Sequence, residues 1–208
     1  TINNVETLAS VSHILNRGAE WYKGLCLSNP KSTGTKLISV CGHVQRPGNY
    51  EVTMGTPMKD LIFDMCGGMK PGRTLKAVIP GGSSVPIMTA AETEDCLLDY
   101  EGVVARGSML GSAGMIVMDD STDMVYQIWR LARFYAHESC AQCTQCREGT
   151  AWTTKILERI LAGKGKAADL DLLLSLSENM TGKTICVLSD SCAAPVVTVV
   201  CSDVVGDD

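Results

Sequence analysis

The sequence has no long hydrophobic run, no excess of basic residues and no secretory leader. Its longest apolar candidate, residues 193–201, is about half of the roughly 18 residues that a membrane helix needs. With 18 basic and 23 acidic residues the net charge is −5, which argues against a nucleic-acid partner, because that partner would require a basic face. The start at Thr1 has neither a basic stretch nor an apolar core. We therefore expect a globular chain with no direct membrane insertion and no nucleic-acid ligand.

Cysteine is the residue that the sequence has in unusual quantity. The 208 residues suit one large domain or two small ones, and a composition of 45% apolar and 20% charged residues is typical of globular chains. Ten cysteines without an export signal fit a reducing compartment, either the cytosol or an organelle matrix. Because the sequence begins with Thr1 rather than Met, we expect a processed product or part of a longer protein.

The hydrophobic period divides the chain into three regions. Apolar residues at helical spacing predict a helix over 6–24, and the turn formers of 28–34 mark a boundary after it. From residue 36 the period changes to two, which predicts a small α+β domain of about 80 residues. Its expected parts are strands 37–40, 50–52, 76–79 and 115–118, a helix capped by Thr56 with Pro57 at its first position and ended by Gly67 and Gly68, and an irregular stretch over 87–112.

The last third of the chain has a helical pattern. Ser121 or Thr122 is expected to cap a first helix. A second helix is expected to follow Cys146 and to end at 163–165, and a third to begin near Asp169. Short connections between them predict an antiparallel bundle. The expected fold class is therefore α+β, with a small sheet domain followed by an α-helical bundle.

Three of the ten cysteines form a C-x-x-C-x-x-C run. Cys140, Cys143 and Cys146 lie between the first and second helices of the predicted bundle. Two-residue gaps in a tight loop can present three thiolates to one cubane cluster, so the run favours a [4Fe–4S] centre. Zinc sites more often use two separated C-x-x-C pairs, and a disulfide would leave one thiol unpaired. Zinc and the absence of any metal stay open as alternatives.

A cubane cluster needs a fourth ligand. The candidates are Cys186, Cys192, Cys201 and His137. His137 would extend the run to H-x-x-C-x-x-C-x-x-C, although the helix dipole alone also favours a histidine at a helix C-terminus. We prefer Cys186, because it follows a turn directly after the third helix and an antiparallel bundle can return that turn to the cysteine loop.

The residues around these cysteines resemble a known family. Residues 138–150, ESCAQCTQCREGT, resemble the ESCGxCTPCREGT motif of the flavoprotein subunit of respiratory complex I, which binds NADH and carries FMN. Residues 184–186, TIC, resemble the GxTIC motif of that family. The resemblance implies four [4Fe–4S] ligands, Cys140, Cys143, Cys146 and Cys186. It covers the chain to about residue 195 and includes residues 42–44, 77–84 and 117–123.

The resemblance also implies domains and a second cofactor. The implied domains are 1–34, the C-terminal remnant of an FMN-binding domain; 35–119, a β-grasp (ubiquitin-like, SLBB-like) domain; and 120–208, a helical bundle with the cluster. Residues 1–8 resemble the family stretch that closes the FMN site, which implies flavin contacts for Asn3, Asn4 and Thr7. For Asn4, a helix cap is the alternative interpretation.

The sequence departs from the family in several places. It has no G-x-G-x-x-G run, and in the family the NADH site and most of the FMN site precede the matching part. We therefore do not expect this chain to oxidise NADH by itself; a partner polypeptide or the rest of a longer chain would have to supply the missing sites.

The sequence also departs from the family in its C-terminal part and around the cysteines. The β-branched run 196–200 is a weak helix former where the family has an amphipathic helix. Ala141 and Gln145 stand where the family often has Gly and Pro, and the cations Arg147 and Lys183 either stabilise a reduced cluster or are simply solvated.

The function implied by the resemblance is electron transfer within an NADH:ubiquinone oxidoreductase. The flavin takes a hydride from NADH, and single electrons leave through the [4Fe–4S] cluster. Alternatives are a diaphorase subunit of an NAD-linked hydrogenase or formate dehydrogenase, and a non-catalytic metal-binding assembly module. The implied partners are the other hydrophilic-arm subunits of complex I, especially the small [2Fe–2S] subunit. The implied location is peripheral, on the matrix side of the mitochondrial inner membrane or the cytoplasmic face of a bacterial membrane.

Overall fold

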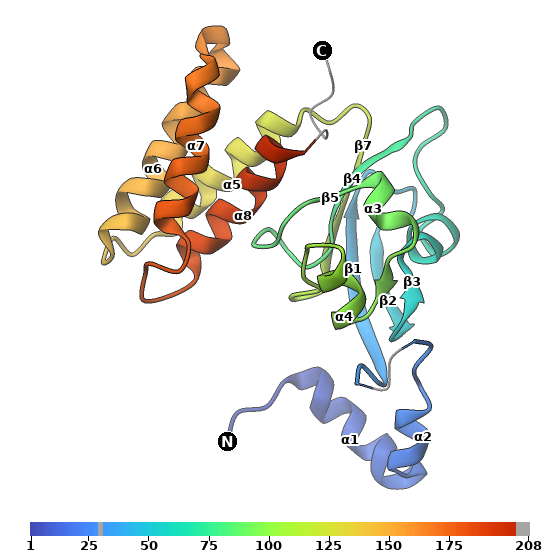
Figure 1. The fold of residues 1–208 in the computed structure, drawn as a ribbon. Helices are drawn as coiled ribbons and strands as arrows, with labels where there is room; N and C mark the ends of the chain where they lie inside the picture. The colour runs from blue at the N-terminus through green and yellow to red at the C-terminus, as the bar shows by residue number, and fades with distance from the viewer. Residues whose placement is uncertain (29–30, 203–208) are drawn as a thin grey trace.

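A sheet region and a helical bundle lie side by side in the computed structural model, which describes residues 1–28 and 31–202 (Figure 1). This arrangement confirms the predicted fold class. Part of the expected boundary loop, residues 29–30, and the last part of the expected bundle domain, residues 203–208, lie outside the described residues. Within the described ranges, no helix combines the length and the apolar character that a membrane crossing needs.

A five-stranded mixed sheet forms the centre of the molecule. Its strand order is β2-β1-β7-β4-β5; the central β1–β7 pair is parallel and the other neighbours are antiparallel. The strands are β1 (Thr35–Gly42), β2 (Gly48–Thr53), β4 (Leu75–Ile79), β5 (Met88–Thr89) and β7 (Gly114–Asp119). A separate pair joins β3 (Thr56–Pro57) to β6 (Leu97–Leu98). The predicted hairpin is β1 with β2.

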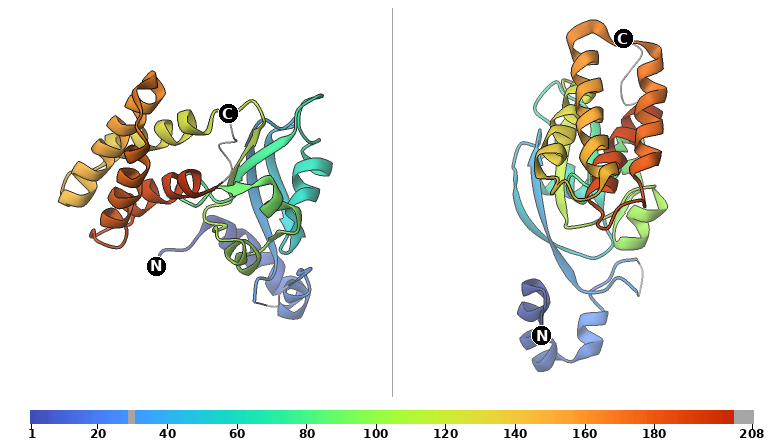
Figure 2. Two further views of the ribbon diagram at one scale, coloured as in Figure 1. Left: turned by 45° about the horizontal axis from the view of Figure 1, so that its top comes forward. Right: turned by 90° about the vertical axis from the view of Figure 1, so that its left-hand side faces the viewer.

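Helices lie at three places around this sheet (Figures 1 and 2). Helices α1 (Val5–Arg17) and α2 (Ala19–Lys23) extend beyond the sheet, at the end away from the bundle. Short helical segments beside the sheet are η1 (Asp60–Met65), α3 (Ala90–Glu94) and α4 (Tyr100–Ala105). The bundle consists of α5 (Met124–Glu138), α6 (Thr144–Arg159) continued by η2 (Ile160–Lys164), α7 (Ala167–Met180) and α8 (Leu188–Cys201). Gly18, with φ +90°, separates α1 from α2 within the expected single helix.

Strands β4 and β7 bury side chains on both faces. Because successive side chains of a strand point to opposite sides, Val78 and Val117 enter one core, and Ile79 and Met118 enter another. The first core lies between the sheet and the segments η1 and α4. The second continues into the bundle and includes Met124, Ile128, Ala132, Ile156, Leu173, Val196 and Val199. The bundle is therefore attached to the sheet by a shared hydrophobic core as well as by the chain connection.

Two sequence-based expectations for the sheet region are wrong. Thr56 and Pro57 form strand β3 and not a helix start; the Thr56 hydroxyl donates to the Thr53 carbonyl oxygen at 2.7 Å. The stretch 87–112 is not irregular, since it holds two short strands and two short helices. Its helix α3 begins at a capping box, in which Thr89 and Glu92 bond each other's backbone N–H groups.

The bundle helices begin at other residues than expected. Asp123 caps α5 by accepting the Tyr126 N–H at 3.0 Å, whereas the Ser121 hydroxyl donates to Asp119. Helix α6 begins before Cys146, at Thr144, and α7 begins at Ala167. The β-branched run 196–200 lies in helix α8, because burial of part of this run in the second core outweighs its weak helix propensity.

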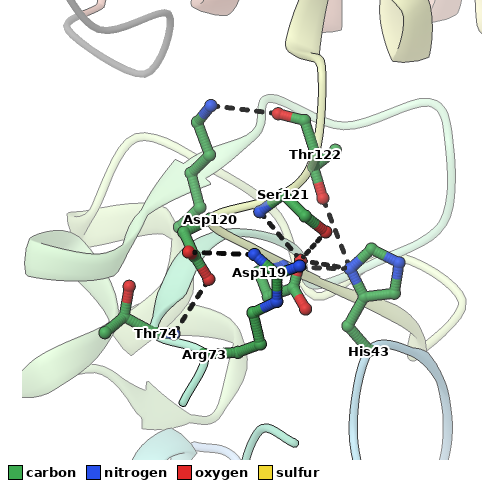
Figure 3. Close-up of polar contacts among 8 residues, drawn as sticks. His43, Arg73, Thr74, Asp119, Asp120, Ser121 and Thr122 are labelled. Atoms are coloured by element: carbon green, nitrogen blue, oxygen red, sulfur yellow. Dashed lines mark hydrogen bonds and ion pairs between the residues drawn. The ribbon is translucent and has the colours of Figure 1, made fainter.

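The connection from the sheet to the bundle is held by a buried carboxylate (Figure 3). Asp119, the last residue of β7, accepts hydrogen bonds from the Ser121 N–H and hydroxyl, and its Oδ1 lies 2.9 Å from His43 Nδ1. Burial alone would raise the pKa of Asp119, but the hydrogen bonds from Ser121 and the charges of His43 and Arg73 outweigh it and hold this pKa below its ordinary value. The ionised form of Asp119 therefore stabilises the fold.

We predict that Asp119→Asn lowers the free energy of unfolding by about 1–3 kcal/mol at pH 7, because buried hydrogen bonds to a charge are lost. A carboxyl whose pKa is lowered by folding adds stability above its unfolded-state pKa and loses it as the pH falls through the folded-state value. The difference between the two proteins should therefore shrink on acidification below about pH 4. Urea unfolding from pH 7 to pH 2 measures it, with the exposed Asp171→Asn as control. A difference that stays constant over this range would contradict the prediction.

Candidate metal centre

The three cysteines of the run surround the first turn of α6. Cys140 lies in the loop after α5 and is exposed, Cys143 is the N-cap residue of α6, and Cys146 is buried within the first turn of α6. The loop is braced by Arg147, whose Nη1 donates to the Ala141 carbonyl oxygen at 2.8 Å. Ala141 has a φ of +64°, a left-handed conformation that glycine adopts more readily.

The fourth predicted ligand lies in the turn between α7 and α8. This turn and the loop before α6 lie at the same end of the bundle (Figures 1 and 2). The Ile185 N–H donates to Cys143 Sγ at 3.5 Å, a direct contact between the two segments. Cys186 itself is exposed, and its carbonyl oxygen accepts the Thr184 hydroxyl at 2.7 Å. The structure therefore brings Cys186 into the neighbourhood of the cysteine run.

A close approach of α6 to α7 lies beside these two segments. A Cβ atom on Gly149 of α6 would meet Met180 Sδ, at the end of α7, at 2.6 Å. Such a contact is shorter than two packed atoms allow, so a larger residue here would require the Met180 side chain to move. The absence of a side chain at Gly149 therefore lets the α7–α8 turn lie close to the start of α6.

Two helix N-termini lie at the cysteines. Cys143 stands at the N-cap position of α6, and Cys186 directly precedes Val187, the N-cap residue of α8. The unpaired N–H groups of a first turn carry a partial positive charge, which stabilises thiolates and other anions. Four thiols at two positive helix ends are a donor set suited to a group of iron and sulfide ions.

The four predicted ligand thiols do not form a site for a single metal ion. Within residues 1–28 and 31–202, no three His, Cys, Asp or Glu side chains converge closely enough to hold a single metal ion. A cubane cluster has a different requirement, because its four thiolates bind irons at separate corners. The chemistry of the donor set, with three thiols in one loop and a fourth in the adjacent turn, fits that requirement.

Comparison with known proteins links this geometry to a family. Residues 126–202 match the model of the NADH-ubiquinone oxidoreductase-F iron-sulfur binding region, and residues 36–126 match that of the SLBB domain. An F subunit of the NADH-quinone oxidoreductase of Rhizobium meliloti (strain 1021) is 48% identical over 197 residues, which are 94% of this chain and 45% of that protein. The chain is a homologue of part of the NADH-quinone oxidoreductase F subunits. The F subunit of Rickettsia bellii (strain OSU 85-389) is 47% identical over 94% of this chain and 47% of its own length.

Solved structures similar to this chain come from an NAD⁺-reducing [NiFe]-hydrogenase. Its air-oxidised form matches 97% of this chain and 34% of the hydrogenase chain, with 34% identity and a TM-score of 0.81. Its H₂-reduced form gives a TM-score of 0.82 at the same identity. The chain spans somewhat under half the length of the curated relatives that it matches. The family match extends to residue 202, beyond the expected limit near residue 195.

The structure also places the three other candidates for a fourth ligand. His137 is exposed and lines a hollow of about 420 Å³ with Arg130, Arg133 and Phe134 on α5. Cys201 ends the 14-residue helix α8, roughly 20 Å from its start at 1.5 Å per residue. Cys192 lies in the bundle core, where burial, with a contribution from Cys146, raises its pKa to about 12.

The residues expected to contact a flavin lie at the start of α1. Asn4 is the helix cap: its Oδ1 accepts the Glu6 N–H at 2.8 Å and the Thr7 N–H at 3.3 Å. Asn4 and Thr7 line a hollow of about 320 Å³ between α1 and the sheet, and Asn3 is exposed. The capping interpretation of Asn4 is confirmed, and the flavin contacts stay predictions.

The sequence identified Arg147 and Lys183 beside the cysteines, but it did not identify Ser139. Ser139 contacts the sulfur of Cys146, and Arg147 bonds the loop backbone rather than only water. Lys183, three positions before Cys186 in the sequence, donates to the Asn179 side chain at 3.5 Å. Nothing in the residue pattern distinguishes Ser139 from an ordinary residue at a helix end, because its partner lies seven positions away.

We predict that Ala141→Val loosens the cysteine loop and that Ala141→Gly does not. The left-handed conformation already costs alanine about 1–2 kcal/mol, the stiff β-branched side chain of valine adds a further penalty of about 1 kcal/mol, and glycine adopts this conformation freely. Amide hydrogen exchange over residues 139–147 should therefore rise about 5–30-fold in the valine variant. Unchanged exchange in Ala141→Val, or a comparable rise in Ala141→Gly, would contradict the prediction.

Proposed function

We propose that this chain is the electron-transfer part of an NADH dehydrogenase flavoprotein and holds a [4Fe–4S] cluster on Cys140, Cys143, Cys146 and Cys186. The observation that carries the proposal is the contact of the α7–α8 turn with the cysteine run through Ile185 and Cys143. The match of residues 126–202 to the iron–sulfur binding region of the family supports it. When bound, such a cluster supplies a one-electron carrier that makes and breaks no substrate bond.

The chain's own residues would bind and orient the cluster. The four thiolates would hold it, with Cys146 on the buried side and Cys140 and Cys186 on the exposed side. The N-termini of α6 and α8 would stabilise the negative charge added on reduction. Arg147 would keep the loop in shape through its bond to Ala141. The helices would thus keep the ligands in nearly the same positions in both oxidation states, which electron transfer favours.

We propose that flavin chemistry comes from the rest of a longer polypeptide. Relatives of about twice this length are named NADH-quinone oxidoreductase subunits, which supports FMN and NADH as the source of electrons. Asn3, Asn4 and Thr7 are proposed FMN contacts, with residues 1–34 part of the FMN-binding domain, 35–119 the β-grasp domain and 120–208 the cluster domain. The lack of any buried residue in α1, where Val5 and Leu15 are about four-fifths exposed, supports assigning α1 to a larger domain.

The proposed assembly is the hydrophilic arm of complex I. In it, the small [2Fe–2S] subunit would be one neighbour, and the chain would lie on the matrix side of the mitochondrial inner membrane or the cytoplasmic face of a bacterial membrane. A second candidate is a diaphorase subunit of an NAD-linked hydrogenase, which the structural match to such a hydrogenase favours. The higher identity to complex I subunits, 48% against 34%, supports the first assignment.

The fourth ligand can be tested by substitution. After anaerobic reconstitution with iron and sulfide, we expect four iron and four sulfide per chain and an EPR signal on reduction. Cys186→Ser should lose this cluster or change its spectrum, because an alcohol is a much poorer iron ligand than a thiolate. The control is Cys201→Ser, which removes another exposed cysteine at the far end of α8 and should leave the cluster unchanged.

Two outcomes would overturn the assignment. An unchanged cluster in Cys186→Ser would exclude that residue as the fourth ligand. One zinc per chain and no acid-labile sulfide would instead favour the non-catalytic assembly module. Identification of the polypeptides that co-purify with the chain separates complex I from a hydrogenase.

A further inference from the structure

The hydroxyl of Ser139 lies against a sulfur of the proposed cluster site. Ser139 is the C-cap residue of α5, and its Oγ is 3.2 Å from Cys146 Sγ. Cys146 is the buried member of the cysteine run, and the contact as a whole is partly buried. Ser139 itself precedes Cys140 and is not one of the proposed ligands.

The direction of this hydrogen bond follows from its surroundings. The Ala141 N–H donates to Ser139 Oγ at 3.3 Å, which occupies an acceptor position of the hydroxyl and leaves its single proton for another partner. A cysteine bound to iron is a thiolate and can only accept. When Cys146 is a ligand, the Ser139 O–H must therefore be the donor and Cys146 Sγ the acceptor.

We propose that Ser139 sets the reduction potential of the cluster by donating this hydrogen bond to Cys146. The inference rests on the proposed function, because it requires that Cys146 binds the cluster. Reduction adds one electron, which increases the negative charge on the sulfur ligands and forms or breaks no bond. The O–H dipole stabilises that added charge more than it stabilises the oxidised cluster, so it raises the potential.

The four proposed ligands differ in this respect. Cys143 accepts only a long contact from the Ile185 N–H, at 3.5 Å. The contact of Cys146 with Ser139 is shorter than that of Cys143, and it becomes charge-assisted when Cys146 is a thiolate. Cys146 is also more buried than Cys143, and the low dielectric of a buried site strengthens a hydrogen bond. Ser139 is therefore a positioning and tuning residue that acts on the cluster through Cys146.

The test is an EPR-monitored redox titration of the full reconstituted chain, with dithionite as the reductant. In Ser139→Ala the ratio of reduced to oxidised cluster at a fixed potential should fall about three- to tenfold, as expected for loss of one hydrogen bond. A tenfold change corresponds to 59 mV for one electron. Ser139→Thr keeps the hydroxyl and should stay within about twofold of the unsubstituted chain. The control Ser191→Ala removes a hydroxyl that bonds the Val187 carbonyl and touches no cysteine sulfur, and should cause no shift.

A second measurement separates the hydrogen bond from a structural effect on the loop. Proton ENDOR before and after exchange into D₂O should show one exchangeable proton fewer coupled to the reduced cluster in Ser139→Ala, and the same loss in Ser139→Gly. An assembled cluster with an unchanged potential in both variants overturns the inference, as does an equal shift in Ser139→Thr. Failure of the unsubstituted chain to take up any cluster would overturn the proposed function itself.

Discussion

The rest of the structure depends on the burial of β4 and β7 on both of their faces. Each strand sends alternate side chains into the core beneath the sheet and into the core shared with the bundle. The side chains of β4 and β7 that face the bundle are buried because α5, α8 and the segment after β4 pack against them. The hydrogen bond between the Tyr135 and Ser83 hydroxyls, at 2.8 Å, adds a polar contact at that same boundary. Because α5 and α8 are held there, the cysteine segments attached to them are also fixed in place.

The electrostatic character of the centre follows from where the helices begin. Cys143 at the start of α6 and Cys186 before the start of α8 both lie where backbone N–H groups have no helical partner. The chain as a whole is acidic, so a cluster that becomes more negative on reduction would be disfavoured by the average field. Local donors act over much shorter distances than that average charge. The helix ends and Ser139 therefore decide the chemistry of the centre more than the net charge does.

Much of this could be predicted from the sequence, and the failures have physical reasons. The three thiols of one loop were identifiable because two-residue gaps place neighbouring cysteines around one centre. The start of α3 was also readable, since Thr89 and Glu92 form the T-x-x-E pattern of a capping box, but it was missed within a stretch without clear periodicity. Thr56 and Pro57 were misassigned because local capping signals do not show that Leu97 and Leu98 lie beside them. Pairing partners forty residues away are not visible in a local pattern.

Helix α8 shows why the fourth cysteine could not be derived from spacing alone. Its β-branched run favours strand over helix in isolation, and Pro195 lies inside it. Val196 and Val199 are nonetheless buried against the bundle, and this tertiary packing keeps the segment helical. The position of Cys186 depends on that helix and on the close approach at Gly149, so it depends on contacts with α5, α6 and α7. The order of the predicted helices already favoured Cys186 among the four candidates, because it follows the turn after the third helix, and the resemblance to a family implied the same residue.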